Sequence, residues 1–227
     1  MGTVAMARGG ASPKGAVSAA DLARAALEAT AVRRAHADHP ALYEAGDNPW
    51  TDQIARELRD AITRSLPPDP GGRHAVAARW RFASLLEAGP VAAEDRPVYD
   101  IAWRVYTADG GALQAQPLVA DCPWRGGWRA LAAASDRLAQ ARAGLKLLCA
   151  MDDPRRAVGE MTLAEACAFR ISAFAPPGEA VMLAFYGKTG GWRETAGFSI
   201  FAHETGRNRI EAVNLGGQER VTGPNAV

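Results

Sequence analysis

Two aspartates, Asp100 and Asp121, flank a predicted β-hairpin and are the residues best placed for chemistry. If Gly110-Gly111 forms a two-residue turn, opposed residues have numbers that sum to 221, as these two do. Directly opposed residues hold their Cβ atoms about 4.5–5.5 Å apart. Like charges this close repel, and a divalent cation bound to both carboxylates removes the repulsion. Pro117 cannot donate to a strand ladder and predicts a bulge or a longer loop, which would shift this register by one or two residues.

The elements that position these acids follow from the periodicity of apolar residues. The predicted elements are a helix from Pro49 to Ser65, strands over Val76–Phe82, Val98–Thr107 and Leu118–Cys122, a helix over Arg129–Ala143, a strand over Leu145–Ala150, a helix over Thr162–Ala173 with Phe169 facing inward, and strands over Ala180–Tyr186, Phe198–His203 and Ile210–Val213. The order α-β-β-β-α-β, followed by α-β-β, predicts an α/β fold with a mixed sheet.

The chain ends are predicted to differ from this domain, which spans residues 47–215. Residues 1–17 and 216–227 are predicted to be disordered. Between them and the domain, residues 18–46 form an accessory helical arm. Its helix begins at a Ser18-x-x-Asp21 capping box, and Leu22, Ala26, Ala29 and Arg33 share one weakly apolar face. We expect this arm to pack on the domain or on a partner, in which case it would support a homo-oligomer.

Composition excludes several classes of protein. The chain has 227 residues and a net charge of +1, so whole-protein charge favours neither DNA nor a membrane surface. No apolar run is long enough to span a bilayer, and no secretory signal is evident. Three cysteines without a paired spacing argue against a disulfide scaffold or a zinc site, so we expect a cytoplasmic protein. Only Lys14, Lys146 and Lys188 are available to a mechanism that needs a lysine. The abundance of Ala, Arg and Gly is typical of a GC-rich genome.

Three segments together resemble the PD-(D/E)xK nuclease superfamily, in particular its uncharacterised bacterial, restriction-endonuclease-like branch. The segments are Val98-Tyr99-Asp100-Ile101-Ala102-Trp103, Pro117-Leu118-Val119-Ala120-Asp121-Cys122-Pro123-Trp124, and Ser135-Asp136-Arg137-Leu138 followed by Leu145-Lys146-Leu147-Leu148. The resemblance covers residues 48–150, and the predicted α-β-β-β-α-β order matches the core of that superfamily. It rests on the order and spacing of short motifs.

The resemblance implies a Mg²⁺-dependent nuclease that acts on DNA, with Mn²⁺ as an alternative cation. In such a protein Asp100 would be the metal-binding aspartate, and Asp121 would be the acid of the (D/E)xK motif. Asp52 or Glu57 would be the acid that some members add from the first helix. In that superfamily these groups hold one or two ions, which activate water and neutralise charge in the transition state.

The sequence departs from the superfamily pattern at the motif lysine, where it has Pro123. Arg137 is the candidate for a migrated cation, and Asp136 beside it is a further carboxylate. Arginine stays protonated, so it can stabilise phosphate charge but is a poor proton-transfer group. The site is therefore either rearranged or inactive. The alternatives are a binding or scaffold protein that keeps the fold without catalysis, and an unrelated α/β domain whose arm mediates oligomerisation.

Five of the six tryptophans precede an arginine, which on strands is simple in-and-out alternation. The segment Trp124-Arg125-Gly126-Gly127-Trp128-Arg129 differs, because it follows Asp121 in a glycine-containing loop. Aromatic rings there could stack on bases while arginines pair with phosphates. We therefore predict Trp124, Arg125, Trp128 and Arg129 as nucleic-acid-binding residues. Each candidate site residue also has a purely structural explanation. Asp100 and Asp121 would be strand-end acids that are exposed or paired with arginines, and Asp52 and Glu57 would be solvated helix acids. Asp136 and Arg137 would form a surface ion pair.

Overall fold

The computed structural model describes residues 18–36, 48–65, 74–78, 98–107, 109, 112–124, 127–176, 179–186, 198–204 and 210–213. Its elements are α1 (Ala19–His36), α3 (Asn48–Ser65), β1 (His74–Ala78), β2 (Ile101–Tyr106), β3 (Leu113–Asp121), α4 (Gly127–Gln140), β4 (Leu145–Ala150), β5 (Ala157–Val158), β6 (Met161–Thr162), α5 (Leu163–Ser172), β7 (Ala180–Tyr186), β8 (Phe198–Glu204) and β9 (Ile210–Val213). The predicted α/β class with a mixed sheet is confirmed. The segments predicted to be disordered lie outside the described residues.

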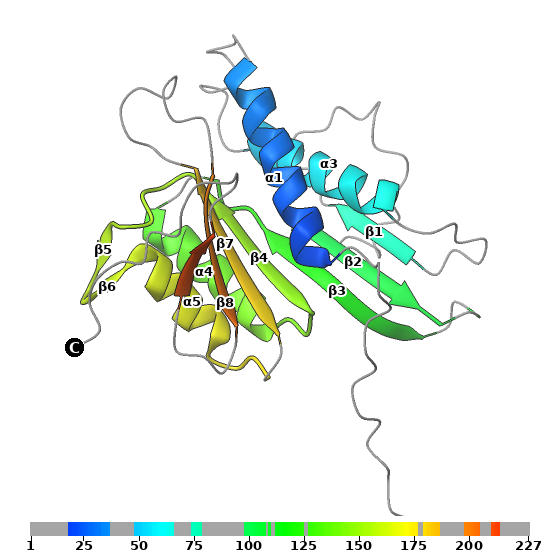
Figure 1. Cartoon of the computed structure of the whole chain (residues 1–227). Helices are drawn as coiled ribbons and strands as arrows, with labels where there is room; N and C mark the ends of the chain where they lie inside the picture. The colour runs from blue at the N-terminus through cyan, green and yellow to red at the C-terminus, as the bar shows by residue number, and fades with distance from the viewer. Residues whose placement is uncertain are drawn as a thin grey trace, which may run out of the picture.

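Seven strands form one sheet in the order β1-β2-β3-β4-β7-β8-β9 (Figure 1). The three central strands β3, β4 and β7 are parallel, and every other neighbouring pair is antiparallel. Parallel neighbours need a crossover connection, and α4 and α5 supply the two crossovers. The small β5–β6 hairpin lies between β4 and α5 and was not predicted from the sequence.

Helices cover both faces of the sheet, with α1 and α3 on one face and α4 and α5 on the other (Figure 1). Alternate strand residues point to opposite faces. Ile101 and Ala120 accordingly pack in the core beneath α1 and α3. Their neighbours Ala102 and Val119 pack in the second core, beneath α4 and α5. A side chain's position along a strand therefore decides which helices it can meet.

The N-terminal helix α1 packs on the domain, which was one of the two alternatives open from the sequence. Ser18 caps it, because the Ser18 Oγ accepts the Asp21 N–H at 3.1 Å and donates to the Asp21 carboxylate at 2.6 Å. Its buried apolar face consists of Leu22, Ala23, Ala26 and Leu27, which join the core of α3. No helix in the described ranges is long and apolar enough to cross a membrane.

The pairing of β2 with β3 agrees with the predicted register at the end where the acids lie. Ile101 pairs with Ala120 and Trp103 with Leu118, so the residue numbers sum to 221. The register shifts between Trp103 and the turn, in the part of β3 that contains Pro117. The expected bulge is therefore present. The pair Tyr106–Leu113 beside the turn has numbers that sum to 219, so the register predicted from a two-residue turn is wrong there and is reached only beyond the bulge.

Candidate carboxylate site

Asp100 and Asp121 converge where two inner strands of the sheet meet at one of their ends. Asp121 is the last residue of β3, and Asp100 immediately precedes β2, which runs in the opposite direction. Both alternate with Ile101 and Ala120, so they share the face of the sheet that α4 and α5 cover. Both side chains are fully buried. This end of the sheet also carries the carboxyl ends of the parallel strands, where ligands commonly bind to open α/β sheets.

Three contacts define the geometry of the pair. The backbone N–H of Cys122 donates to Asp100 Oδ2 at 2.7 Å. The Arg137 Nε, from the last turn of α4, donates to Asp121 Oδ2 at 2.8 Å. The two carboxyl groups also lie within hydrogen-bonding reach of each other. The second oxygen of Asp121, Oδ1, is buried and has no hydrogen-bond partner among the described residues.

The electrostatics of the site reflect two like charges buried together. The pKa of Asp121 is raised to about 6, chiefly by burial and also by the neighbouring Asp100 carboxylate, while the Arg137 guanidinium opposes both effects. The cation paired with Asp121 is Arg137. A buried carboxylate pair of this kind favours either a bound proton or a bound cation.

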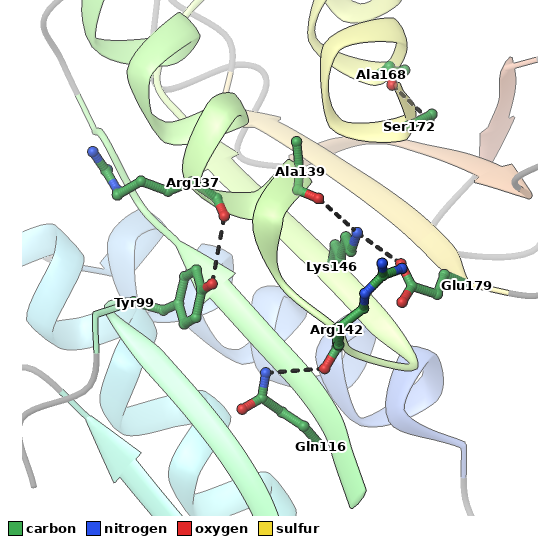
Figure 2. Close-up of polar contacts among 9 residues, drawn as sticks. All are labelled: Tyr99, Gln116, Arg137, Ala139, Arg142, Lys146, Ala168, Ser172 and Glu179. Carbon is green, nitrogen blue, oxygen red and sulfur yellow. Dashed lines mark hydrogen bonds and ion pairs between the residues drawn. The ribbon is translucent and has the colours of Figure 1, made fainter. Parts of the chain in front are cut away.

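Tyr99 belongs to the surroundings of the site, although the sequence did not single it out. Its hydroxyl donates to the backbone carbonyl of Arg137 at 3.5 Å, near the outer limit of hydrogen bonding (Figure 2). Burial and then the charge of Asp121 raise the pKa of the Tyr99 phenol. The sequence signal that could have found Tyr99 is its position directly before Asp100. A residue next to a strand-end acid lies close to the site that the acid forms.

Among the described residues, no third acid joins Asp100 and Asp121 in a metal cluster. No group of three or more His, Cys, Asp or Glu side chains within the described ranges is arranged to hold a metal. Glu57, which is buried on α3, is therefore not grouped with Asp100 and Asp121, which corrects that expectation. The reason is topological, since α3 covers the opposite face of the sheet. Asp52 is also on α3, and its side chain lies outside the described residues.

Asp136 and Arg137 point to different partners despite being adjacent in the sequence. Arg137 pairs with buried Asp121, as described above, so it does reach the predicted site. Asp136 instead pairs with Arg170 of α5 through two contacts at 2.6 and 2.8 Å. Neighbouring residues on a helix differ in direction by about 100°, which explains the separation. Asp136 is therefore not a further carboxylate of this site, and the two residues do not form a surface ion pair with each other.

The predicted nucleic-acid segment is divided between the core and the surface. Trp124 is buried, with its ring centroid 5.9 Å from that of Tyr186 and 6.2 Å from that of Phe198. A ring enclosed in this way cannot stack on a base, so the prediction for Trp124 is wrong. Trp128 is half-buried beneath the guanidinium of Arg170, and Arg129 is exposed. Arg125 lies outside the described residues.

The atoms present suit a hard divalent cation in part. Mg²⁺ prefers carboxylate and water oxygens and commonly takes one or two protein carboxylates. Asp100 and Asp121 supply two carboxylates, and Asp121 Oδ1 is a buried acceptor without a donor. The Arg137 guanidinium occupies the other oxygen of Asp121. The donor set therefore fits a cation that competes with, or displaces, this guanidinium.

Comparison with known proteins adds no further assignment. No family model matches the sequence, and neither a curated protein nor a solved structure matches it significantly.

Proposed function

We propose that the protein is a PD-(D/E)xK-like nuclease that cleaves DNA phosphodiesters with Mg²⁺ or Mn²⁺, through a rearranged site. The observation that carries the proposal is the convergence of two buried carboxylates from β2 and β3, one with an oxygen that has no donor. Such a pair is unfavourable for stability alone, because two ionised carboxylates in a low-dielectric site repel. The order α-β-β-β-α-β from α3 to β4 supports the same proposal.

Each residue has a distinct role in this proposal. Asp100 and Asp121 hold the cation, which when bound supplies a Lewis acid for the phosphate and lowers the pKa of water. The backbone N–H of Cys122 orients Asp100 through its bond to Oδ2. Arg137 takes the place of the missing lysine as a positive charge for the phosphate oxygens. Since arginine does not give up its proton, Arg137 is not a general base.

Cation binding is tested by thermal unfolding. We expect Mg²⁺ or Mn²⁺ to raise the melting temperature of the wild-type protein, because a ligand that binds only the folded state stabilises it. Asp100→Asn should abolish that shift. Glu160→Gln, which changes an exposed acid in a turn, is the matched control and should keep it. Equal melting temperatures with and without the cation in the wild-type protein would contradict the proposal.

Cleavage is tested with supercoiled plasmid DNA in the presence of Mg²⁺ or Mn²⁺. We expect nicking by the wild-type protein and none by Asp121→Ala. Cleavage that persists in Asp121→Ala would place the activity elsewhere or in a contaminant. Chelation of the cation should stop the wild-type reaction, and excess Mg²⁺ should restore it.

A second candidate is a protein with the same fold that binds without catalysis. Two observations favour it: Pro123 stands where the superfamily has its lysine, and the Arg137 guanidinium already pairs with Asp121. This candidate predicts no nicking at any cation concentration, and Asp121→Asn should bind its partner as well as the wild-type protein does. An electrophoretic mobility shift with double-stranded DNA would show whether that partner is nucleic acid.

A further inference from the structure

A divalent cation at the carboxylate pair would compete with the Arg137 guanidinium. That guanidinium donates to Asp121 Oδ2 at 2.8 Å, and the other oxygen of Asp121 is buried without a hydrogen-bond partner among the described residues. A cation bound to this carboxylate would bring a second positive group to it at short range, where Coulomb repulsion is strong.

The Arg137 side chain is free to leave the pair without moving its helix. It is 38% exposed, whereas Asp121 is fully buried, so its guanidinium lies at the boundary between the site and solvent. Asp121 is the one acid paired with Arg137 among the described residues. Displacement therefore breaks one ion pair and leads toward water.

The backbone of Arg137 is held by separate contacts. Its carbonyl accepts the Tyr99 hydroxyl, and the carbonyl of Ala139 lies 3.5 Å from Lys146 Nζ. The charge of Lys146 is in turn paired with Glu179 at 2.7 Å. Figure 2 shows the guanidinium of Arg137 directed away from both Tyr99 and Lys146. The last turn of α4 can therefore stay in place while the side chain changes rotamer.

We propose that Arg137 is a resident counter-ion that a divalent cation displaces and a phosphodiester then captures. The inference rests on the proposed cation site and names the regulation of that site. A displaced guanidinium presents a planar set of donors that matches phosphate oxygens. Cation and phosphodiester should consequently bind with positive coupling, each tightening the binding of the other. In the absence of a phosphodiester, Arg137 opposes cation binding.

Calorimetric titration with Mn²⁺ tests the competition without relying on activity. Arg137→Gln removes the competing charge, so we expect it to bind Mn²⁺ about tenfold more tightly than the wild-type protein, equivalent to about 1.4 kcal/mol. Arg137→Lys keeps a positive charge and should stay within about threefold of the wild-type Kd, which is about 0.7 kcal/mol. Arg142→Gln, which changes an exposed arginine just after the same helix, is the matched control and should leave the Kd unchanged.

Dimethyl phosphate, a phosphodiester monoanion, tests the capture step. We expect it to tighten Mn²⁺ binding several-fold in the wild-type protein and in Arg142→Gln, but not in Arg137→Gln. Circular dichroism and thermal unfolding of each variant would establish that its fold is intact before titration.

The outcomes separate this inference from the proposed function. Equal Mn²⁺ affinity in the wild-type protein and Arg137→Gln, or weaker affinity in Arg137→Gln, would overturn the counter-ion exchange and leave the cation site standing. An effect of dimethyl phosphate that survives in Arg137→Gln would overturn the capture step. Absence of Mn²⁺ binding in both proteins would overturn the exchange together with the cation site.

Discussion

The sheet carries two sites of buried charged side chains on the face beneath α4 and α5. The balanced site joins two opposite charges, whereas the unbalanced pair brings two like charges together. Lys146 of β4 is fully buried and pairs with Glu179 at 2.7 Å, one positive charge against one negative charge. Asp121 pairs with Arg137 and also lies beside Asp100, whose like charge raises the pKa of Asp121. Lys146 and Leu148 share a face of β4, and Leu148 is the partner of Asp121, so the two sites are neighbours.

The balanced site serves the fold. Lys146 lies near the last turn of α4, where its charge is favourable to the helix dipole and its Nζ meets the Ala139 carbonyl. Glu179 precedes β7, so the pair joins β4 to the start of the next parallel strand. Every charge in this site has a partner from the chain itself. The comparison teaches that two like charges buried side by side are a better indicator of a ligand than one pair of opposite charges.

Breaking the balanced pair should have the largest effect on stability. Lys146→Met removes the lysine that pairs with buried Glu179, which should lower the free energy of unfolding by about 3 kcal/mol. Lys146→Met combined with Glu179→Met removes both charges and should recover most of that loss. Urea denaturation at neutral pH measures both values. A double variant no more stable than Lys146→Met would show that packing, and not charge, is what the lysine contributes.

The unbalanced pair should make stability depend on pH in a defined direction. Because the pKa of Asp121 is raised from 3.8 to about 6 in the folded protein, the folded state holds a proton that the unfolded state has released between these values. Stability due to this group is thus fully present below about pH 4 and is lost as the pH rises through about 6, by about 2–3 kcal/mol.

Asp121→Asn does not titrate and provides the reference for that measurement. The difference in unfolding free energy between the wild-type protein and Asp121→Asn should change over this pH interval and level off above it. A difference that is constant from pH 4 to 7 would mean that Arg137 keeps Asp121 ionised throughout.

Removing one charge from the unbalanced pair should stabilise the protein. Asp100→Asn removes the like charge beside Asp121 and retains an oxygen to accept the Cys122 N–H. We expect the unfolding free energy at pH 8 to rise by about 1 kcal/mol, in contrast to the loss in Lys146→Met. A loss of stability in Asp100→Asn would show that this carboxylate is needed for the fold.

The smallest effect should come from the exposed ion pair between Asp136 and Arg170. Both side chains are nearly half exposed, and solvent screens such pairs. Asp136→Asn should leave the urea midpoint within experimental error. A resolved loss of stability would instead mean that this pair holds α4 to α5. Its contribution to the free energy of unfolding would then resemble that of a buried ion pair.

Local pattern was sufficient for most of the elements. The bounds of β4, β7 and β9 match the predicted residues, because apolar strands bounded by breakers are read directly from the chain. The capping box of α5 likewise places its start, with Thr162 accepting the Glu165 N–H. Phe169 was predicted to face inward but is 66% exposed, since small residues fill the inner face of α5. The two-residue strands of β5–β6 are too short to show a period.

The sequence by itself placed Asp100 and Asp121 at the ends of two adjacent strands, and the strand pairs nearest these acids have the predicted register. Only the tertiary structure decided what surrounds them. It brought Arg137 rather than Asp136 to Asp121, left Glu57 out of the pair, and enclosed Trp124 in the core. These outcomes depend on how helices rotate and dock across the sheet. That docking is set by packing among residues distant in the chain, which no local pattern encodes.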